Sequence, residues 1–162
     1  MTLAVVAGLL GGCVGEPAPV ETTPAFASED EAFAAAEETY RAYVDALNAR
    51  MSGSPGNIEP EDWLVGSALN SELESQEELA AAGKSNVGQL SVSAVEAASW
   101  KASSATVHVC LDVSKTQVLD ADGTDVTPAA RPLVVPLEVI VMTAGSRLLI
   151  ADINGYPEGF DC

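Results

Sequence analysis

The first clear pattern along the chain is helical. Apolar residues recur every three or four positions over about six turns, which is typical of an amphipathic helix, at Phe33, Ala36, Tyr40, Tyr43, Val44 and Leu47. Ser28 followed by Glu31 forms a capping box, so the helix is expected to begin there. The Gly- and Pro-containing segment 52–57 ends it.

A second helical region is predicted over 61–82. Its apolar side is supplied by Trp63, Leu64, Leu69, Leu73 and Leu79. We expect two pieces, separated around 66–70, and a stop at Gly83 in the left-handed conformation.

After Lys84 the apolar spacing changes towards two, which indicates strands. We expect strands or parts of strands at 87–100, 105–114, 116–119 with 124–127, 132–143 and 146–153. Turns are predicted at Asp122-Gly123 and at 144–146. In the second strand, Val107, Val109, Leu111 and Val113 share one face, expected to be core, and His108, Cys110, Asp112 and Ser114 share the other.

This order predicts an α+β fold. A long N-terminal helix and shorter helices would pack in a curved antiparallel sheet, because only such an arrangement buries both apolar sets. From Cys13 onward the chain is long enough for one domain, expected at 28–162, and nothing calls for a second.

Residues 1–13 indicate where the protein is located in the cell. The apolar run is too short to span a bilayer but suits a secretory signal. Its ending, Leu10-Gly11-Gly12-Cys13, resembles the bacterial lipobox, which implies a signal peptide at 1–12 and a diacylglyceryl-modified Cys13 as mature N-terminus. No Lys or Arg precedes Cys13, and a start upstream of Met1 would supply the usual basic segment.

Residues 14–27 carry three prolines and no helical period, so 13–27 reads as the lipidated cysteine and a flexible tether. The expected location is the outer face of the cell membrane.

Export permits disulfides, and with Cys13 assigned to the anchor, Cys110 and Cys162 are the natural pair. The alternative is a nucleophilic Cys110 served by His108 and Asp112. Neighbours on one strand face stand about 6.8 Å apart, too far for direct hydrogen bonds. We therefore expect the disulfide.

Composition excludes several functions. With 24 Asp and Glu against seven Lys and Arg, the net charge of −17 argues against nucleic-acid binding. The acidic segment 120–125 lacks the glycine and glutamate positions of an EF-hand, and no zinc motif or phosphate-binding loop is present. We expect neither a metal nor a cofactor.

Several stretches carry a family resemblance: Glu-Glu-Thr-Tyr-Arg-Ala-Tyr at 37–43, Val-Cys-Leu-Asp-Val-Ser at 109–114, Asp-Val-Thr-Pro at 125–128 with Arg131-Pro132, and the closing Asp161-Cys162. In this element order the chain resembles the nuclear-transport-factor-2-like superfamily of cystatin-like cones, and within it actinobacterial envelope lipoproteins. The resemblance covers about 28–162. The superfamily includes isomerases, hydratases, transport adaptors and inert scaffolds, so it implies the fold rather than an activity.

The residues expected at a pocket are Tyr40, Tyr43, Trp63 and Trp100, although aromatic residues at such positions usually serve packing. No catalytic set can be assigned. The expected function is a non-catalytic, membrane-anchored lipoprotein that binds a small apolar ligand or an envelope protein. Two alternatives stay open: a small isomerase- or hydratase-type enzyme with a Tyr/Asp site in the cone, and an accessory subunit of an envelope transport complex.

Overall fold

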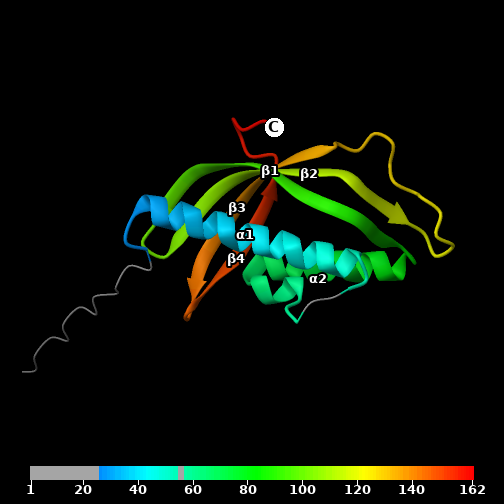
Figure 1. Cartoon of the computed structure of the whole chain (residues 1–162), viewed down its shortest axis with the longest axis horizontal. Helices are drawn as coiled ribbons and strands as arrows, with labels where there is room; N and C mark the ends of the chain where they lie inside the picture. The colour runs from blue at the N-terminus through cyan, green and yellow to red at the C-terminus, as the bar shows by residue number, and fades with distance from the viewer. Residues whose placement is uncertain (1–25, 55–56) are drawn as a thin grey trace, which may run out of the picture.

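The computed structural model describes residues 26–54 and 57–162 (Figure 1). The predicted signal peptide, Cys13 and the tether up to residue 25 lie outside the described residues. Within them the chain is α+β, as predicted, with two α-helices and one short 3-10 helix on a four-stranded antiparallel sheet of order β1-β2-β3-β4. The elements are α1 (Glu29–Met51), η1 (Pro60–Trp63), α2 (Gly66–Ala81), β1 (Ser85–Lys101), β2 (Ser104–Leu119), β3 (Val134–Ala144) and β4 (Arg147–Gly155).

Helix α1 begins where the capping box predicts. The Ser28 hydroxyl accepts a hydrogen bond from the Glu31 backbone N–H at 3.2 Å, and the Glu31 carboxylate accepts one from the Ala27 N–H at 2.9 Å. Three acidic residues in the first turn and Arg50 in the last complement the helix dipole. Local sequence alone therefore fixes this end of the helix.

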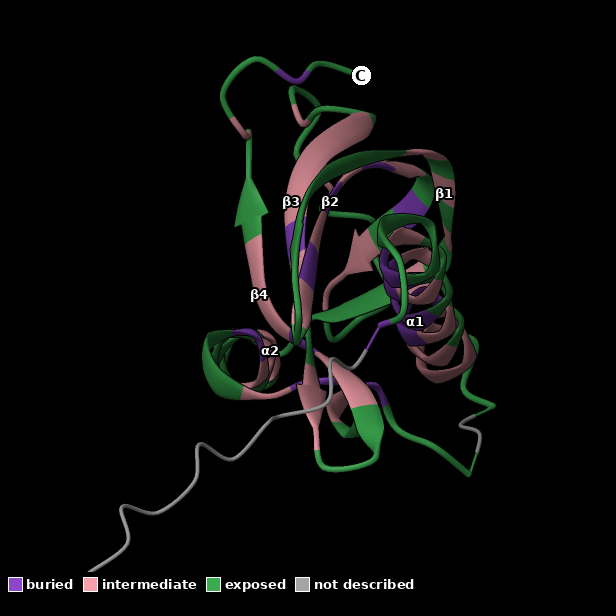
Figure 2. Cartoon of the chain, turned by 90° about the vertical axis from the view of Figure 1, so that its left-hand side faces the viewer, coloured by how far each residue is buried: buried purple, intermediate pink, exposed green. Residues whose placement is uncertain are grey.

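The core lies between α1 and the inner face of the bent sheet, which arches over the helices (Figure 2). The small side chains of Ala32 and Ala36 are fully buried and let α1 approach the strands closely. Tyr40 fills the space beside them. The predicted core face of β2 is confirmed at Val107 and Val109, and the fully buried set is completed by Val139, Val141 and Ile150.

Strand β1 follows β2 irregularly, with register shifts between Gln89 and Ser91, Val92 and Ala94, and Ala97 and Ser99. Helix α1 satisfies backbone groups at these shifts. The Asn48 amide accepts from the Leu90 N–H at 2.7 Å and donates to the Leu90 carbonyl at 3.0 Å, and Arg41 donates to the Val92 carbonyl at 3.3 Å. Side chains of α1 thus fix the helix to β1.

Gly88 marks the closest approach of β1 to β2. Its φ is +105°, and a Cβ there would lie 2.1 Å from the Lys115 carbonyl oxygen. Only glycine fits this position.

The structure refines the prediction in three details. Residues 105–114 and 116–119, expected as strands or parts of strands, belong to one strand, β2, because pairing with β1 continues through Lys115. Segment 124–127 is no strand but follows a turn in which the Asp120 carboxylate accepts from the Asp122 and Thr124 N–H groups, leaving a single bridge to Leu119.

The third correction concerns the second helical region, whose break lies at Leu64 and Val65 rather than at 66–70. There the chain turns aside to reach β4. Val65 donates to the Ile150 carbonyl at 2.9 Å, and Leu64 is buried beside that strand. Gly83 adopts the predicted left-handed conformation, with φ +62°.

Candidate functional site

Two open pockets lie along α1. The first, which we call the α2 pocket, has a volume of about 560 Å³ and lies among the C-terminal end of α1, helix α2, the start of β1 and the end of β2. Its volume falls in the roughly 300–1,000 Å³ range of small-molecule sites. Its lining comprises Leu47, Arg50, Met51, Glu72, Ser75, Gln76, Leu79, Ala80, Lys84, Ser85, Asn86, Leu90, Val113, Thr116, Val118 and Arg131.

The second, the Trp63 pocket, has a volume of about 690 Å³ and lies beside the N-terminal half of α1, η1 and the β3–β4 turn. Its lining comprises Ala35, Glu38, Thr39, Ala42, Ile58, Asp62, Trp63, Ser146, Arg147 and Leu148. Arg147 lies over the Trp63 ring at 6.0 Å and donates to the Asp62 carbonyl at 2.7 Å.

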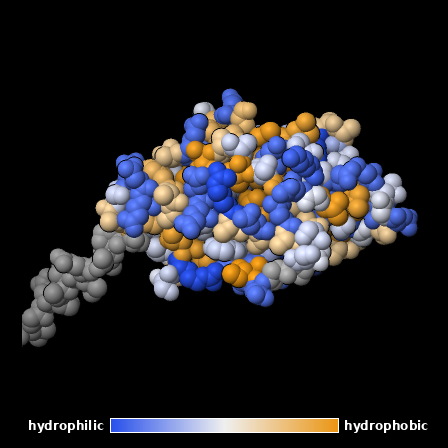
Figure 3. All heavy atoms as spheres, in the orientation of Figure 1, coloured by the Kyte–Doolittle hydropathy of each residue, from blue (hydrophilic) through white to orange (hydrophobic). Residues whose placement is uncertain are grey.

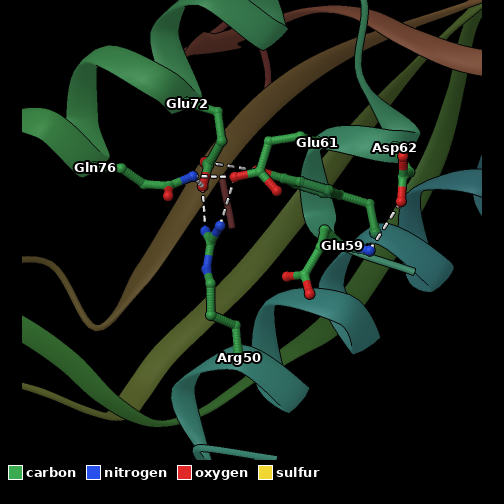
Figure 4. Close-up of polar contacts among 7 residues, drawn as sticks. Arg50, Glu59, Glu61, Asp62, Glu72 and Gln76 are labelled. Atoms are coloured by element: carbon green, nitrogen blue, oxygen red, sulfur yellow. Dashed lines mark hydrogen bonds and ion pairs between the residues drawn. The ribbon is translucent and has the colours of Figure 1, made fainter. Parts of the chain in front are cut away.

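A network of charged side chains forms one wall of the α2 pocket (Figure 4). Arg50 extends from the last turn of α1 and pairs with Glu61 at 2.7 Å and with Glu72. Gln76, one turn beyond Glu72 on α2, donates to both carboxylates. The network links α1, η1 and α2 through side chains.

Tyr43 completes this network by donating to Glu72 at 3.2 Å. Both carboxylate oxygens of Glu72 are therefore occupied, one by Arg50 and Gln76 and the other by Tyr43. Among the described residues, no buried side-chain nitrogen or oxygen lacks a hydrogen-bond partner. The buried polar groups of this network therefore all have hydrogen-bond partners.

The pKa shifts in this wall follow from its contacts. Burial opposes the charge of Arg50, but the hydrogen bonds and charges of Glu72 and Glu61 outweigh it and raise the pKa of Arg50. Burial also acts to raise the pKa of Glu61, but hydrogen bonds from the backbone, Gln76 and Arg50 lower it. Burial, followed by the negative charge of Glu72, raises the pKa of the Tyr43 hydroxyl, so this tyrosine keeps its proton.

Two further cations line the α2 pocket without an ion pair. Of the chain's seven Lys and Arg, Arg50, Lys84 and Arg131 belong to this lining, and among the described residues neither Lys84 nor Arg131 lies within ion-pair distance of a carboxylate. The Arg131 guanidinium donates to the Thr116 hydroxyl at 2.8 Å, to the Val113 carbonyl at 3.0 Å and to the Thr116 carbonyl. All three acceptors are neutral, so its orientation is fixed without an ion pair among the described residues.

The aromatic residues predicted at a pocket are spread over the molecule. Trp63 lines the Trp63 pocket. Tyr40 and Tyr43 are buried under the sheet with ring centroids 6.0 Å apart, and burial raises the pKa of Tyr40. Trp100 lies near the end of β1 with 37% of its surface exposed. Tyr40, Tyr43 and Trp100 line neither pocket.

Cys110 and Cys162 form a disulfide, which confirms their predicted pairing. Cys110 therefore offers no thiol to the alternative nucleophilic site. His108 lies on the outer face of β2, 3.7 Å from Glu138, and its ring packs at 5.0 Å from Phe160 of the C-terminal segment. Hydrogen bonds from Ser114 lower the pKa of the Asp112 carboxyl. The His108 contact with Phe160 holds the C-terminal segment against β2. The contact of Asp112 is local to the strand.

Sequence reasoning missed Arg50, Glu61, Glu72 and Gln76, as well as Lys84 and Arg131. The spacing of Glu72 and Gln76, one helical turn apart, was a signal for part of the network. Figure 3 shows hydrophilic and hydrophobic residues interspersed over the face on which α1 lies.

Other observations set limits on the site. Within 26–54 and 57–162, no three His, Cys, Asp or Glu side chains gather in a way that could hold a metal ion. None of the helices in this part of the chain combines the length and apolarity needed to cross a membrane. No known family model matches the chain, and no curated protein is significantly similar to it.

Proposed function

We propose that this chain is an extracytoplasmic lipoprotein with a cone-like, cystatin-like domain of the nuclear-transport-factor-2-like type. Cys13 carries the lipid that anchors it to the outer face of the cell membrane, and the folded part binds a small ligand or an envelope protein without catalysing a reaction. The observation that carries the binding role is the α2 pocket, an open hollow of about 560 Å³ with apolar side chains from four elements.

The saturated wall supports binding over catalysis. A tyrosine and a carboxylate do meet at Tyr43 and Glu72, which is the pairing an isomerase-type site would need. However, Glu72 is neutralised by Arg50, and the raised pKa of Tyr43 makes its proton hard to remove. These groups are better suited to holding the helices in place than to transferring protons.

The binding role is tested with a neutral fluorescent apolar probe, Nile red, added to the full chain carrying Cys13→Ala. We expect saturable fluorescence enhancement that is lost in Leu79→Glu, because Leu79 lines the pocket. Leu73→Glu is the matched control, since Leu73 lies on the same helix, is 50% exposed and does not line the pocket. No enhancement, or equal loss in both variants, would contradict a ligand role for the pocket.

The anchor is tested separately in cells. Cys13→Ala is expected to abolish fatty-acid labelling and to release the protein from the membrane fraction. Cys162→Ala serves as the control for loss of a cysteine, and it should keep the label. A Cys13→Ala protein that still incorporates fatty acid would exclude the proposed anchor.

A further inference from the structure

The placement of positive charge in this acidic chain points to the chemistry of the ligand. A net charge of −17 repels anions from most of the surface. Against that background, three of the seven cations line one pocket, and two of them, Lys84 and Arg131, have no carboxylate partner among the described residues. Other cations, such as Lys101 and Arg147, also lack an ion pair among the described residues, so what distinguishes Lys84 and Arg131 is their common place in one pocket with aliphatic walls.

Arg131 is held in place for contact with an anion. Its three hydrogen bonds to β2 fix the guanidinium at the pocket wall and use three of its five N–H groups on neutral oxygens. The Asp125 carboxylate accepts from the Thr127 N–H at 2.9 Å and from Gln117 at 2.8 Å, and the charge of Arg131 acts on it only through space, without an ion pair among the described residues. A guanidinium fixed in this way binds carboxylates strongly because little ordering is left to do.

The remainder of the pocket is suited to an apolar body. Half-buried aliphatic side chains come from α1, α2, β1 and β2, namely Leu47, Leu79, Leu90, Val113 and Val118. The one carboxylate in the lining, Glu72, is occupied by Arg50, Gln76 and Tyr43. The pocket therefore combines apolar walls with two positive charges that form no ion pair among the described residues.

We infer that the α2 pocket binds an apolar molecule that ends in one anionic group, with Lys84 and Arg131 at the anion and the aliphatic walls around the body. This inference rests on the proposed binding function and names the ligand class for the same site. A fatty carboxylate is the simplest probe of this class.

The test is displacement of Nile red from the full chain carrying Cys13→Ala, with three ligands that share one alkyl chain: decanoate, decanol and decyltrimethylammonium. At low salt, decanoate should displace the probe at about five- to tenfold lower concentration than decanol, as expected for two partly exposed ionic contacts. The cationic ligand should be the weakest. Raising the salt concentration should reduce the advantage of decanoate, since salt screens charges.

Substitutions assign the effect to the two cations. Lys84→Gln should weaken decanoate about two- to threefold and leave decanol unchanged. Arg131→Gln should weaken decanoate more, and Arg131→Lys should retain part of the affinity because the charge remains. Lys101→Gln, at the far end of β1 and outside the lining, is the control and should bind like the parent. If Arg131→Gln fails to fold, the ligand series and Lys84→Gln still test whether the pocket prefers an anionic ligand.

The outcomes separate the two proposals. If Nile red binds but decanol competes as well as decanoate, or the salt dependence is absent, the anionic ligand class is wrong and the binding function stands. If neither the probe nor any of the three ligands binds, the proposed ligand role fails together with this inference.

Discussion

The α2 pocket and the Trp63 pocket differ in the carboxylates that accompany their cations. In the Trp63 pocket, Arg147 lies over the Trp63 ring and donates to the Asp62 carbonyl, and two acidic residues, Glu38 and Asp62, also line the hollow. In the α2 pocket, the single lining carboxylate, Glu72, is paired with Arg50, and Lys84 and Arg131 form no ion pair among the described residues. Size alone therefore does not distinguish the two pockets, but the balance of charge in their linings does.

The strongest test of the comparison removes the centre of the α2 pocket wall. Arg50→Met leaves Glu61 and Glu72 facing each other without a cation. Breaking a buried pair costs roughly 3–5 kcal/mol, but the Arg50 and Glu72 side chains are 30% and 15% exposed, so we expect a loss of about 2–3 kcal/mol in the free energy of unfolding. Urea denaturation followed by circular dichroism measures it.

Arg41→Met is the matched control for this change. Arg41 pairs with Glu37 on the exposed face of the same helix, with both side chains more than 40% exposed. Its loss should cost less than about 1 kcal/mol. Equal effects at the two positions would mean that the Arg50 network does not hold the pocket wall.

Tyr43, which lies behind the wall and donates to Glu72, should have the next largest effect on stability. Tyr43→Phe removes one donor from the Glu72 carboxylate, and a partly buried hydrogen bond to a charged group contributes about 1.5 kcal/mol. Tyr40→Phe is the control, because it makes the same change at the neighbouring buried tyrosine, whereas the hydrogen bond to Glu72 comes from Tyr43. Nile red binding should persist in Tyr43→Phe, whereas a selective loss of binding without loss of stability would favour the enzyme alternative.

A smaller effect is confined to acidic solution. The pKa of Glu61 is lower in the folded protein than its ordinary value of 4.5, so the unfolded chain takes up the proton more readily. The stability contributed by this shift is fully present above about pH 4.5 and is lost as the pH falls through the folded-state pKa. Urea denaturation between pH 6 and pH 3 should therefore give a shallower loss of stability for Glu61→Gln than for the parent, and an identical profile would remove Glu61 as a source of acid sensitivity.

The smallest effect is expected in the Trp63 pocket. Arg147→Gln removes the contact with the Trp63 ring and weakens the contact with the Asp62 carbonyl, at an exposed site where a cation–π contact is worth about 0.5–1 kcal/mol. Thermal unfolding measures the change. Decanoate displacement of Nile red should be unaffected, and a loss there comparable to that of Arg131→Gln would erase the difference between the pockets.

The sequence predicts the parts of this fold that depend on neighbouring residues. The cap at Ser28, the left-handed Gly83 and the alternation along Val107 and Val109 are confirmed because each is decided within a few positions of the chain. The break at Leu64 and Val65 was misplaced because it depends on Ile150, far along the chain. The disulfide was predictable only because few cysteines were left to pair.

The candidate site was largely beyond reach of the sequence. Arg50, Glu61 and Glu72 come from three separate helices, and each alone looks like an ordinary surface charge. Arg131 is placed by carbonyls of Val113 and Thr116 in β2, beyond Asp112, where the pairing of β2 with β3 ends. The sequence predicts aromatic residues at a pocket, but most of them lie in the core or near the end of a strand.

The register shifts of β1 have a consequence for crowded conditions. β1 lies at one edge of the sheet and is 17 residues long, and a straight edge of that length invites pairing with the same edge of another copy. The three shifts interrupt its row of N–H and C=O groups, and α1 satisfies those of Leu90. Two copies that meet along this edge therefore face an interrupted row of backbone groups, which disfavours a continuous intermolecular sheet.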